Sequence, residues 1–239
     1  MRPSDDKTIN IDEARELVAD QKLWPRVRDF LWDFAPSIHE SWIEGMFGSL
    51  EVSKFWDRQT SKLPSIQTSR HLKKALLASL GVEPCFHTFP KDDGSRLLLL
   101  DGATLESMAK WMGALACAEQ LRRVTDGTTV RSLKAALPGI YPEVFGFAAY
   151  FGKWRMENGE WKIEGDAGAG ICRLGRQILF SILSSLPAPL LRRLELKLPK
   201  DSLVGVPASD GNSPFSIFNF QFVSKLLKLR FPEAYALCC

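Results

Sequence analysis

The stretch of sequence that decides the fold is ATLESMAKWMGALACAEQLRR, residues 103–123. Apolar side chains recur along it at helical spacing in two stripes, formed by Leu105, Met108, Met112 and Leu115 and by Trp111, Ala114, Ala118 and Leu121. Only a narrow polar edge remains, made by Glu106, Lys110 and Gln120. Because a helix that is apolar on most sides lies at the centre of a core, these residues are predicted to form the central helix of a helix-rich protein.

Other helical patterns surround this segment. Residues 66–80 are predicted to form a helix that Gly81 ends. Asp126-Gly127 ends the central helix, Thr128 or Thr129 caps the next one, and Pro138-Gly139 stops it. Helices are also predicted over 142–150, over 171–186 and after Ser213-Pro214. Two apolar faces stand out: Val27, Phe30, Leu31 and Phe34 near the N-terminus, and Phe215, Phe218, Phe222, Leu226 and Leu229 in the last helix.

Short strands are expected at three places. Residues 85–89 and 96–100 are apolar runs on either side of Lys91-Asp92-Asp93-Gly94, a pattern typical of a hairpin. Residues 154–162 read as a turn or a second small hairpin, and residues 193–198 alternate leucine with charged residues at the period that suits a strand. The predicted fold class is therefore mainly α, either irregular all-α or α+β with one or two short hairpins. We expect a flexible tail over 1–10 and a single domain over 11–239, in which aromatic-rich helices of 11–62 pack on 66–239.

The charge is nearly balanced overall but uneven along the chain. The 239 residues include 31 Lys or Arg and 28 Asp or Glu, a net charge of +3. Residues 1–60 carry 8 basic and 12 acidic side chains, whereas residues 166–239 carry 9 basic and 5 acidic. A nucleic-acid-binding protein concentrates basic residues far more than this. The asymmetry indicates either two different protein-facing surfaces or no functional division at all.

The cysteines and the first residues indicate a compartment. Residues 1–10 are polar and charged rather than signal-like, and five cysteines stand at scattered positions: Cys85, Cys117, Cys172, Cys238 and Cys239. We therefore expect reduced thiols in a cytoplasmic protein, with Cys238-Cys239 as a tail of ordinary thiols. No uncharged apolar run reaches the roughly 18 residues that a spanning helix needs, and residues 177–191 read as a buried core helix.

No motif for catalysis or cofactor binding stands out. The chain has no phosphate-binding loop and no G-x-S-x-G motif, and none of the three histidines (His39, His71 and His87) has partners at metal-ligand spacing. Gly165, Gly168 and Gly170 precede a helix without matching a dinucleotide fingerprint, so a loop-to-helix turn is the favoured interpretation. The sequence predicts no catalytic residue, no metal and no cofactor. An active site assembled from distant residues stays open.

Residues 97–134, LLLLDGATLESMAKWMGALACAEQLRRVTDGTTVRSLK, resemble a known family. A helix rich in small residues is followed by Leu121-Arg122-Arg123-Val124, then Asp126-Gly127, then Val130-Arg131 and Leu133. This order is similar to that of the SctK family (YscK in one system), the adaptor of the type III secretion sorting platform. Residues 170–186 and 194–199 also resemble the later half of the family, so the resemblance covers about residues 66–199.

The resemblance implies a function and partners. Members of the family are helix-rich and non-enzymatic, and they bridge the pod protein SctQ to the cytoplasmic forkhead-associated domains of the inner-membrane ring protein SctD. The chain would then be a cytoplasmic virulence-associated adaptor of a Gram-negative bacterium, peripheral to the inner membrane through the secretion apparatus, without inserting into the membrane or binding nucleic acid. The alternatives are an enzyme with a pocket built from distant residues, or a weak nucleic-acid-binding module that uses the basic C-terminal third.

Two interpretations of the turn after the central helix are open. In the first, Arg122, Arg123, Asp126 and Arg131 form a polar surface that a partner binds. In the second, Gly127 takes a positive φ and ends the long helix, while Asp126 binds nearby backbone N–H groups or pairs with an arginine. The structural interpretation is favoured, because a turn between two packed helices needs such residues whatever the partner.

Overall fold

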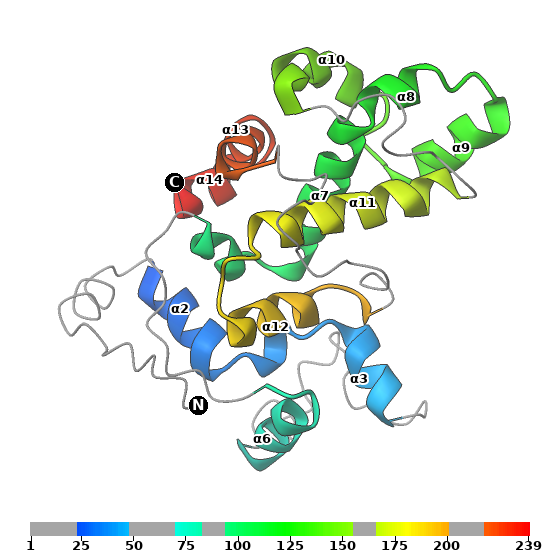
Figure 1. The fold of residues 1–239 in the computed structure, drawn as a ribbon. Coiled ribbons are helices and arrows are strands. Elements are labelled where there is room, and N and C mark those ends of the chain that lie inside the picture. The colour runs from blue at the N-terminus through cyan, green and yellow to red at the C-terminus, as the bar shows by residue number, and fades with distance from the viewer. Residues whose placement is uncertain (1–22, 48–69, 83–93, 155–165, 201–217) are drawn as a thin grey trace, which may run out of the picture.

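A computed structural model describes residues 23–47, 70–82, 94–154, 166–200 and 218–239. In these ranges the chain forms α-helices and short 3-10 helices and no strand, which confirms the predicted mainly α class. Two long helices, α7 (Gly102–Ala116) and α11 (Ala167–Ile182), lie side by side in the body (Figure 1). Around them, buried apolar side chains from Leu23 to Cys238 form one connected core.

The crossing of α7 and α11 requires glycine on both helices. A Cβ atom placed on Gly113 would lie 2.1 Å from the carbonyl oxygen of Ile171. One placed on Gly175 would lie 1.7 Å from the carbonyl oxygen of Ala109. The two backbones therefore approach more closely than any larger residue would permit, and the second half of α7 is buried as its apolar stripes predict.

The predicted central helix is interrupted near its end. α7 stops at Ala116, Cys117 takes φ −97° and ψ 10°, and α8 (Ala118–Arg122) continues the path. The prediction of a helix over 103–123 was right in extent and wrong in continuity. The chain then forms α9 (Gly127–Ala136), α10 (Val144–Ala148) and the 3-10 helix η3 (Ala149–Trp154), so the helix predicted over 142–150 is present from Val144 onward.

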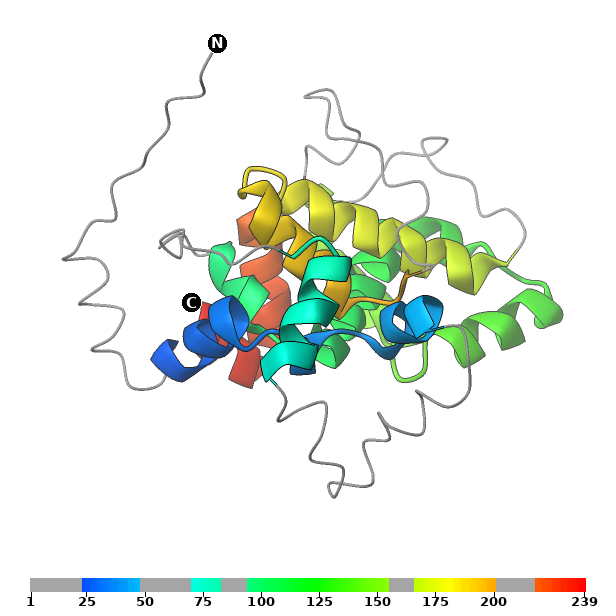
Figure 2. The ribbon, with the colours of Figure 1, turned by 90° about the horizontal axis from the view of Figure 1, so that it is seen from below.

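The N-terminal elements lie on one side of α12 (Ala188–Lys197). They are α2 (Leu23–Trp32), the 3-10 helix η1 (Ala35–Ser37), α3 (Glu40–Phe47) and α6 (Arg70–Ser79), which spread across the lower side of the molecule (Figures 1 and 2). The predicted stripe of Val27, Phe30, Leu31 and Phe34 is buried. Gly81 follows α6 with a φ of 69°, the value expected of a glycine that ends a helix.

The last two helices are α13 (Phe220–Arg230) and α14 (Pro232–Cys238). Asn219 caps α13 by accepting a hydrogen bond from the Phe222 backbone N–H at 3.2 Å. The predicted start at Ser213-Pro214, and Phe215, lie outside the described residues. Phe218, Phe222 and Leu226 are buried as predicted, but Leu229 is 42% exposed. Cys238 is buried within α14, so the prediction of a tail of two ordinary thiols was wrong for this residue.

Two predicted strands are helical. In the run 96–100, residues 96–99 belong to the 3-10 helix η2 (Ser95–Leu99) and Leu100 follows it, while the matching run 85–89 lies outside the described residues. Residues 193–198 form the end of α12, because Arg193 and Lys197 are buried along with the leucines and the alternation therefore does not mark two faces. The helix predicted over 171–186, like the one read over 177–191, is divided: α11 ends at Ile182 and α12 begins after Pro187. The second hairpin, predicted over 154–162, lies outside the described residues beyond Trp154.

Candidate partner-binding surfaces

The turn between α8 and α9 carries residues singled out from the sequence. Asp126 is the N-cap of α9, since its carboxylate accepts hydrogen bonds from the Thr129 backbone N–H at 2.7 Å and from the Thr129 hydroxyl at 2.8 Å. These hydrogen bonds lower the pKa of Asp126. Asp126 therefore takes the capping role predicted for Thr128 or Thr129.

Gly127 corrects a second prediction about this turn. It is the first residue of α9 and its φ is not positive, so it does not end the preceding helix in the left-handed conformation. Arg123 stays in the right-handed region and the chain is extended at Asp126, so the turn needs no left-handed residue. A Cβ atom on Gly127 would meet nothing within 4 Å.

The three arginines near the turn are exposed, and their contacts differ. Arg122 donates a hydrogen bond to the Phe145 carbonyl oxygen at 3.1 Å and lies 3.8 Å from Glu119, so it ties α8 to α10. Arg131 donates to the Gly127 carbonyl oxygen at 3.2 Å, within its own helix. Arg123 is exposed at the end of α8. Within the described ranges, no hydrogen bond or ion pair joins the side chains of Arg122, Arg123, Asp126 and Arg131 to one another, so their role in binding stays a prediction.

A second surface lies where α13 runs beside α10 and η3. Lys225 donates a hydrogen bond to the Tyr150 carbonyl oxygen, and its Nζ lies 5.3 Å from the centre of the Phe151 ring. Further along α13, Arg230 forms an ion pair with Glu143 at 2.8 Å. Because later residues of α13 contact earlier residues of α10 and η3, the two segments run antiparallel. Sequence reasoning missed this surface because helical spacing from Phe222 and Leu226 had assigned Leu229 to the inner face.

Two cations of α12, Arg193 and Lys197, are buried. Lys197 is 4% exposed, and its Nζ donates to the carbonyl oxygens of Leu98 at 2.6 Å and Leu100 at 2.8 Å. Burial lowers the pKa of Lys197 to about 7, against the opposing effect of the nearby Asp101 carboxylate. Arg193 is 2% exposed. It donates to the carbonyl oxygen of Leu31 at 3.4 Å, so α12 binds α2 and η2 through their backbones.

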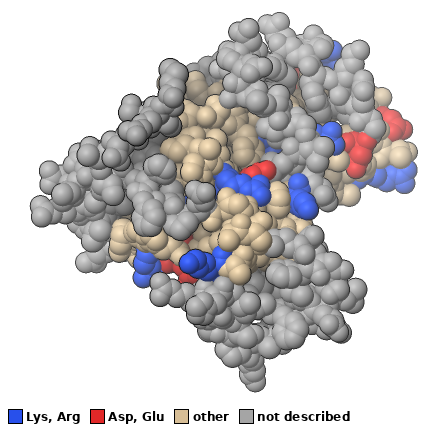
Figure 3. Space-filling model, turned by 60° about the horizontal axis from the view of Figure 1, so that its bottom comes forward, with Lys and Arg blue, Asp and Glu red and all other residues tan. Residues whose placement is uncertain are grey.

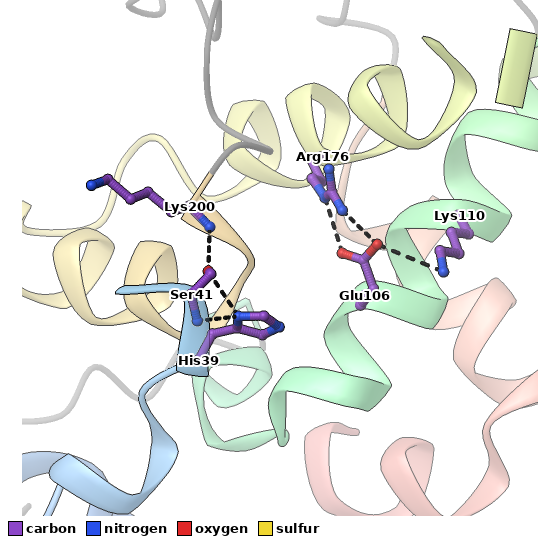
Figure 4. A network of polar contacts seen from close by, with 6 residues as sticks. All are labelled: His39, Ser41, Glu106, Lys110, Arg176 and Lys200. Carbon is purple, nitrogen blue, oxygen red and sulfur yellow. Dashed lines mark hydrogen bonds and ion pairs between the residues drawn. The ribbon is translucent and has the colours of Figure 1, made fainter. Parts of the chain in front are cut away.

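The segment from His39 to Trp42 also bonds to α12 and the turn after it. The His39 backbone N–H donates to the Leu196 carbonyl oxygen at 2.8 Å, and Trp42 Nε1 donates to that of Leu198 at 2.9 Å. Figure 4 shows His39 beside Ser41, whose hydroxyl accepts a hydrogen bond from the Lys200 backbone N–H at 2.9 Å. His39 thus has a structural partner on α3. The side chains of His71 and His87 lie outside the described part of the chain.

A further polar contact in Figure 4 joins the two central helices. Arg176 of α11 donates to Glu106 of α7 from Nε at 2.9 Å and from Nη2 at 2.5 Å, and Lys110 lies 3.8 Å from the same carboxylate. The side chains of Arg176 and Glu106 are both mostly buried. This two-point contact fixes the register of α7 against α11.

The glycine-rich segment before α11 has a packing role. Asp166 accepts a hydrogen bond from the Gly168 backbone N–H at 3.0 Å and so caps the helix itself. A Cβ atom on Gly168 would lie 2.2 Å from the Cβ atom of Ala136, which shows that this residue allows α11 to contact α9. Gly165 lies outside the described residues. Among the residues that are described, no group of three His, Cys, Asp or Glu side chains could hold a metal ion.

Comparison with known families identifies the chain. Residues 46–216, well over half of the sequence, match the family YscK, described as YOP proteins translocation protein K. The chain belongs to the YscK family. No curated protein and no solved structure gives a significant match. The matched range extends beyond residues 66–199 on both sides, from the end of α3 through α12, and leaves α2, α13 and α14 outside it.

Membership of the YscK family makes this a type III secretion protein. The family consists of structural or adaptor proteins of the secretion machinery and is not known for enzymatic activity. In the ranges that the structure describes, no helix is both long enough and apolar enough to span a bilayer. Figure 3 shows Lys and Arg in small groups, some beside Asp or Glu, on the described part of one face rather than in one continuous basic patch.

Proposed function

We propose that this YscK-family chain is a non-enzymatic, cytoplasmic adaptor that links a SctQ-like pod protein to the cytoplasmic domain of a SctD-like inner-membrane ring protein. The observation that carries the proposal is the family match over residues 46–216. The internal use of polar groups supports it, because the cations of α12 and the Glu106–Arg176 pair hold helices together. We also propose one domain over 11–239, in line with the single connected core.

Arg122, Arg123, Asp126 and Arg131 remain candidate partner contacts within this proposal. Asp126 and Arg131 bond within α9, so substituting them would disturb the helix as well as any interface. Arg123 is exposed and contacts Gln120 through its backbone N–H, which a side-chain substitution keeps, so Arg123→Ala is the variant of the four that disturbs the fold least. Rim charges of this kind tune association rate and salt dependence more than affinity.

The test is co-purification of the chain with the pod protein and with the ring-protein cytoplasmic domain of the same genome, each at low and high salt. We expect a stable complex with the pod protein and a weaker one with the ring domain. Absence of both complexes at low salt would overturn the adaptor proposal. A metal or nucleotide bound at about one per purified chain would instead favour an enzyme, and tight binding of labelled DNA or RNA would favour a nucleic-acid-binding module.

A further inference from the structure

Lys197, at the end of α12, lies against α2 and η2 and has no ion pair among the described residues. Its side chain is 4% exposed, and its Nζ donates to the carbonyl oxygens of Leu98 at 2.6 Å and Leu100 at 2.8 Å. On the α2 side, Nζ lies 4.9 Å from the centre of the Phe30 ring. Because burial disfavours a charge, a lysine placed here binds its proton less tightly than a lysine in water.

The site accommodates Lys197 without its proton. A neutral amine keeps two N–H donors, and the site offers two carbonyl oxygens, so both hydrogen bonds survive deprotonation. Burial is the largest effect on the pKa of Lys197 and lowers it to about 7. The charged groups nearby have smaller effects: Asp101, the N-cap of α7, raises this pKa, and Arg26 on α2 lowers it. On α12 itself, the buried Arg193 lies one turn earlier. Lys197 therefore loses its proton near neutral pH while α2 is in place.

α2 covers Lys197 and contacts α12 through side chains. The Phe30 ring lies against Lys197, and Arg193 donates to the Leu31 carbonyl oxygen at 3.4 Å. Beyond α2 the chain passes through η1, and the His39 backbone N–H then donates to the Leu196 carbonyl oxygen at 2.8 Å. Figure 1 shows α2 beside α12 at the lower side of the molecule. α2 can therefore move away from α12 as a unit while the chain from His39 onward keeps its place.

We propose that docking of α2 onto α12 and η2 is linked to protons, so that α2 detaches with uptake of one proton from solvent at Lys197. With α2 detached, Lys197 faces water and its pKa returns toward the ordinary value of 10.5. Between pH 7 and 10.5, docking should therefore strengthen as pH rises, by up to about tenfold per pH unit. Below pH 7 both states carry the proton, so this group makes docking independent of pH. This proton linkage does not depend on the proposed adaptor function, and α2 lies outside the matched residues 46–216.

The experiment is hydrogen–deuterium exchange on the full-length chain. Protection factors, which remove the intrinsic pH dependence of exchange, are compared for residues 26–32 of α2 and residues 105–115 of α7. In the wild type, α2 protection should stay level from about pH 6 to about pH 7 and then rise by up to about tenfold per pH unit toward about pH 9. α2 should be less protected than α7. Its protection should also change little in dilute urea, because the opening of one helix exposes little surface.

Three variants assign the effect to Lys197. Lys197→Met keeps an unbranched apolar stem but cannot bind a proton, so α2 protection should lose its pH dependence. Asp101→Asn keeps a side chain that can cap α7 but removes the charge that raises the pKa of Lys197, so the rise in protection should begin at a lower pH. Lys228→Met changes an exposed lysine on α13 and is the matched control, which should give the wild-type profile.

Three outcomes would overturn the inference. Level protection of α2 across the whole pH range in the wild type would show that no proton is taken up on detachment. The same rise in Lys197→Met as in the wild type would assign the proton to another group. If α2 and α7 share one protection factor and one dependence on urea, α2 opens only together with the whole fold, and it does not detach on its own.

Discussion

α12 and α13 are basic, leucine-containing helices of 10 and 11 residues that the fold uses in opposite ways. α12 buries Arg193 and Lys197 in the interior, whereas α13 keeps Lys228 and Leu229 at the surface. Both helices place a lysine near an aromatic ring: Lys197 Nζ lies 4.9 Å from the centre of Phe30, and Lys225 Nζ lies 5.3 Å from that of Phe151. Contact with an aromatic ring therefore does not decide which cation is buried.

The difference lies in the hydrogen-bond acceptors. Lys197 reaches two carbonyl oxygens almost a hundred residues earlier in the chain, those of Leu98 in η2 and of Leu100 directly after it. Burial of a charged or polar group is tolerated only when such partners satisfy it. Lys225 donates a hydrogen bond to the carbonyl oxygen of Tyr150, which is an exposed residue. Lys197 thus lies among backbone oxygens of buried residues, whereas Lys225 contacts the backbone oxygen of an exposed residue.

The largest expected effect tests the buried side of this comparison. Lys197→Ala removes two hydrogen bonds, leaves buried carbonyl oxygens without this donor and opens a cavity, so the free energy of unfolding should fall by about 3 kcal/mol or more. Lys225→Ala is the matched control and should cost about 1 kcal/mol or less, since its side chain is only half-buried. Chemical denaturation of both variants measures the two values. Equal losses would mean that the acceptors do not distinguish the helices.

The next effect concerns pH. Lys197 has a pKa of about 7 in the folded protein against 10.5 for an ordinary lysine. Between pH 7 and 10.5 this lysine is protonated in the unfolded chain and largely neutral in the folded one, so the unfolded chain binds more protons. Lys197 should therefore raise the free energy of unfolding with pH by up to about 1.4 kcal/mol per pH unit. Below pH 7 it should contribute no such rise. Lys197→Met should remove that rise. Denaturation curves from pH 6 to about 9 for wild type and variant give the difference, and parallel curves would contradict a buried, readily neutralised lysine.

Smaller effects are expected on the surface side. Arg122→Ala loses the hydrogen bond to the Phe145 carbonyl oxygen and should lower the free energy of unfolding by about 0.5 to 1 kcal/mol. Arg123→Ala should change it by less than about 0.5 kcal/mol, because this side chain is exposed. Thermal melts check both values. A larger loss for Arg123→Ala than for Arg122→Ala would show that Arg123 has an internal structural role.

The smallest effect is expected at Gly127. Its φ is not positive and a Cβ atom would meet nothing within 4 Å, so Gly127→Ala should leave stability unchanged or raise it by up to about 0.5 kcal/mol. Gly81→Ala is the contrasting variant, since a φ of 69° strains alanine, and it should destabilise the protein. Strong destabilisation of the Gly127→Ala variant would instead support the positive φ at Gly127 that the sequence predicted.

The sequence alone determined the helical class, the buried stripes of α2 and α7 and the end of α6 at Gly81. These features are local, because helical spacing and a glycine after the last turn specify them without reference to the rest of the chain. Among the candidate site residues, the sequence indicated that Asp126 would bind nearby backbone N–H groups. The stretch that resembled the family, residues 97–134, lies within the matched range.

Only the tertiary structure decided the path of residues 193–198, the burial of Arg193 and Lys197, and the exposure of Leu229. Alternation of leucine with cations predicts a strand only if the cations face water. Here the two cations are buried and donate hydrogen bonds to carbonyl oxygens of distant residues. The pairing of α13 with α10 and η3 depends in the same way on contacts between residues about 75 positions apart, such as Lys225 with Tyr150. Local periodicity carries no information about such partners, so this contact became visible only in the folded chain.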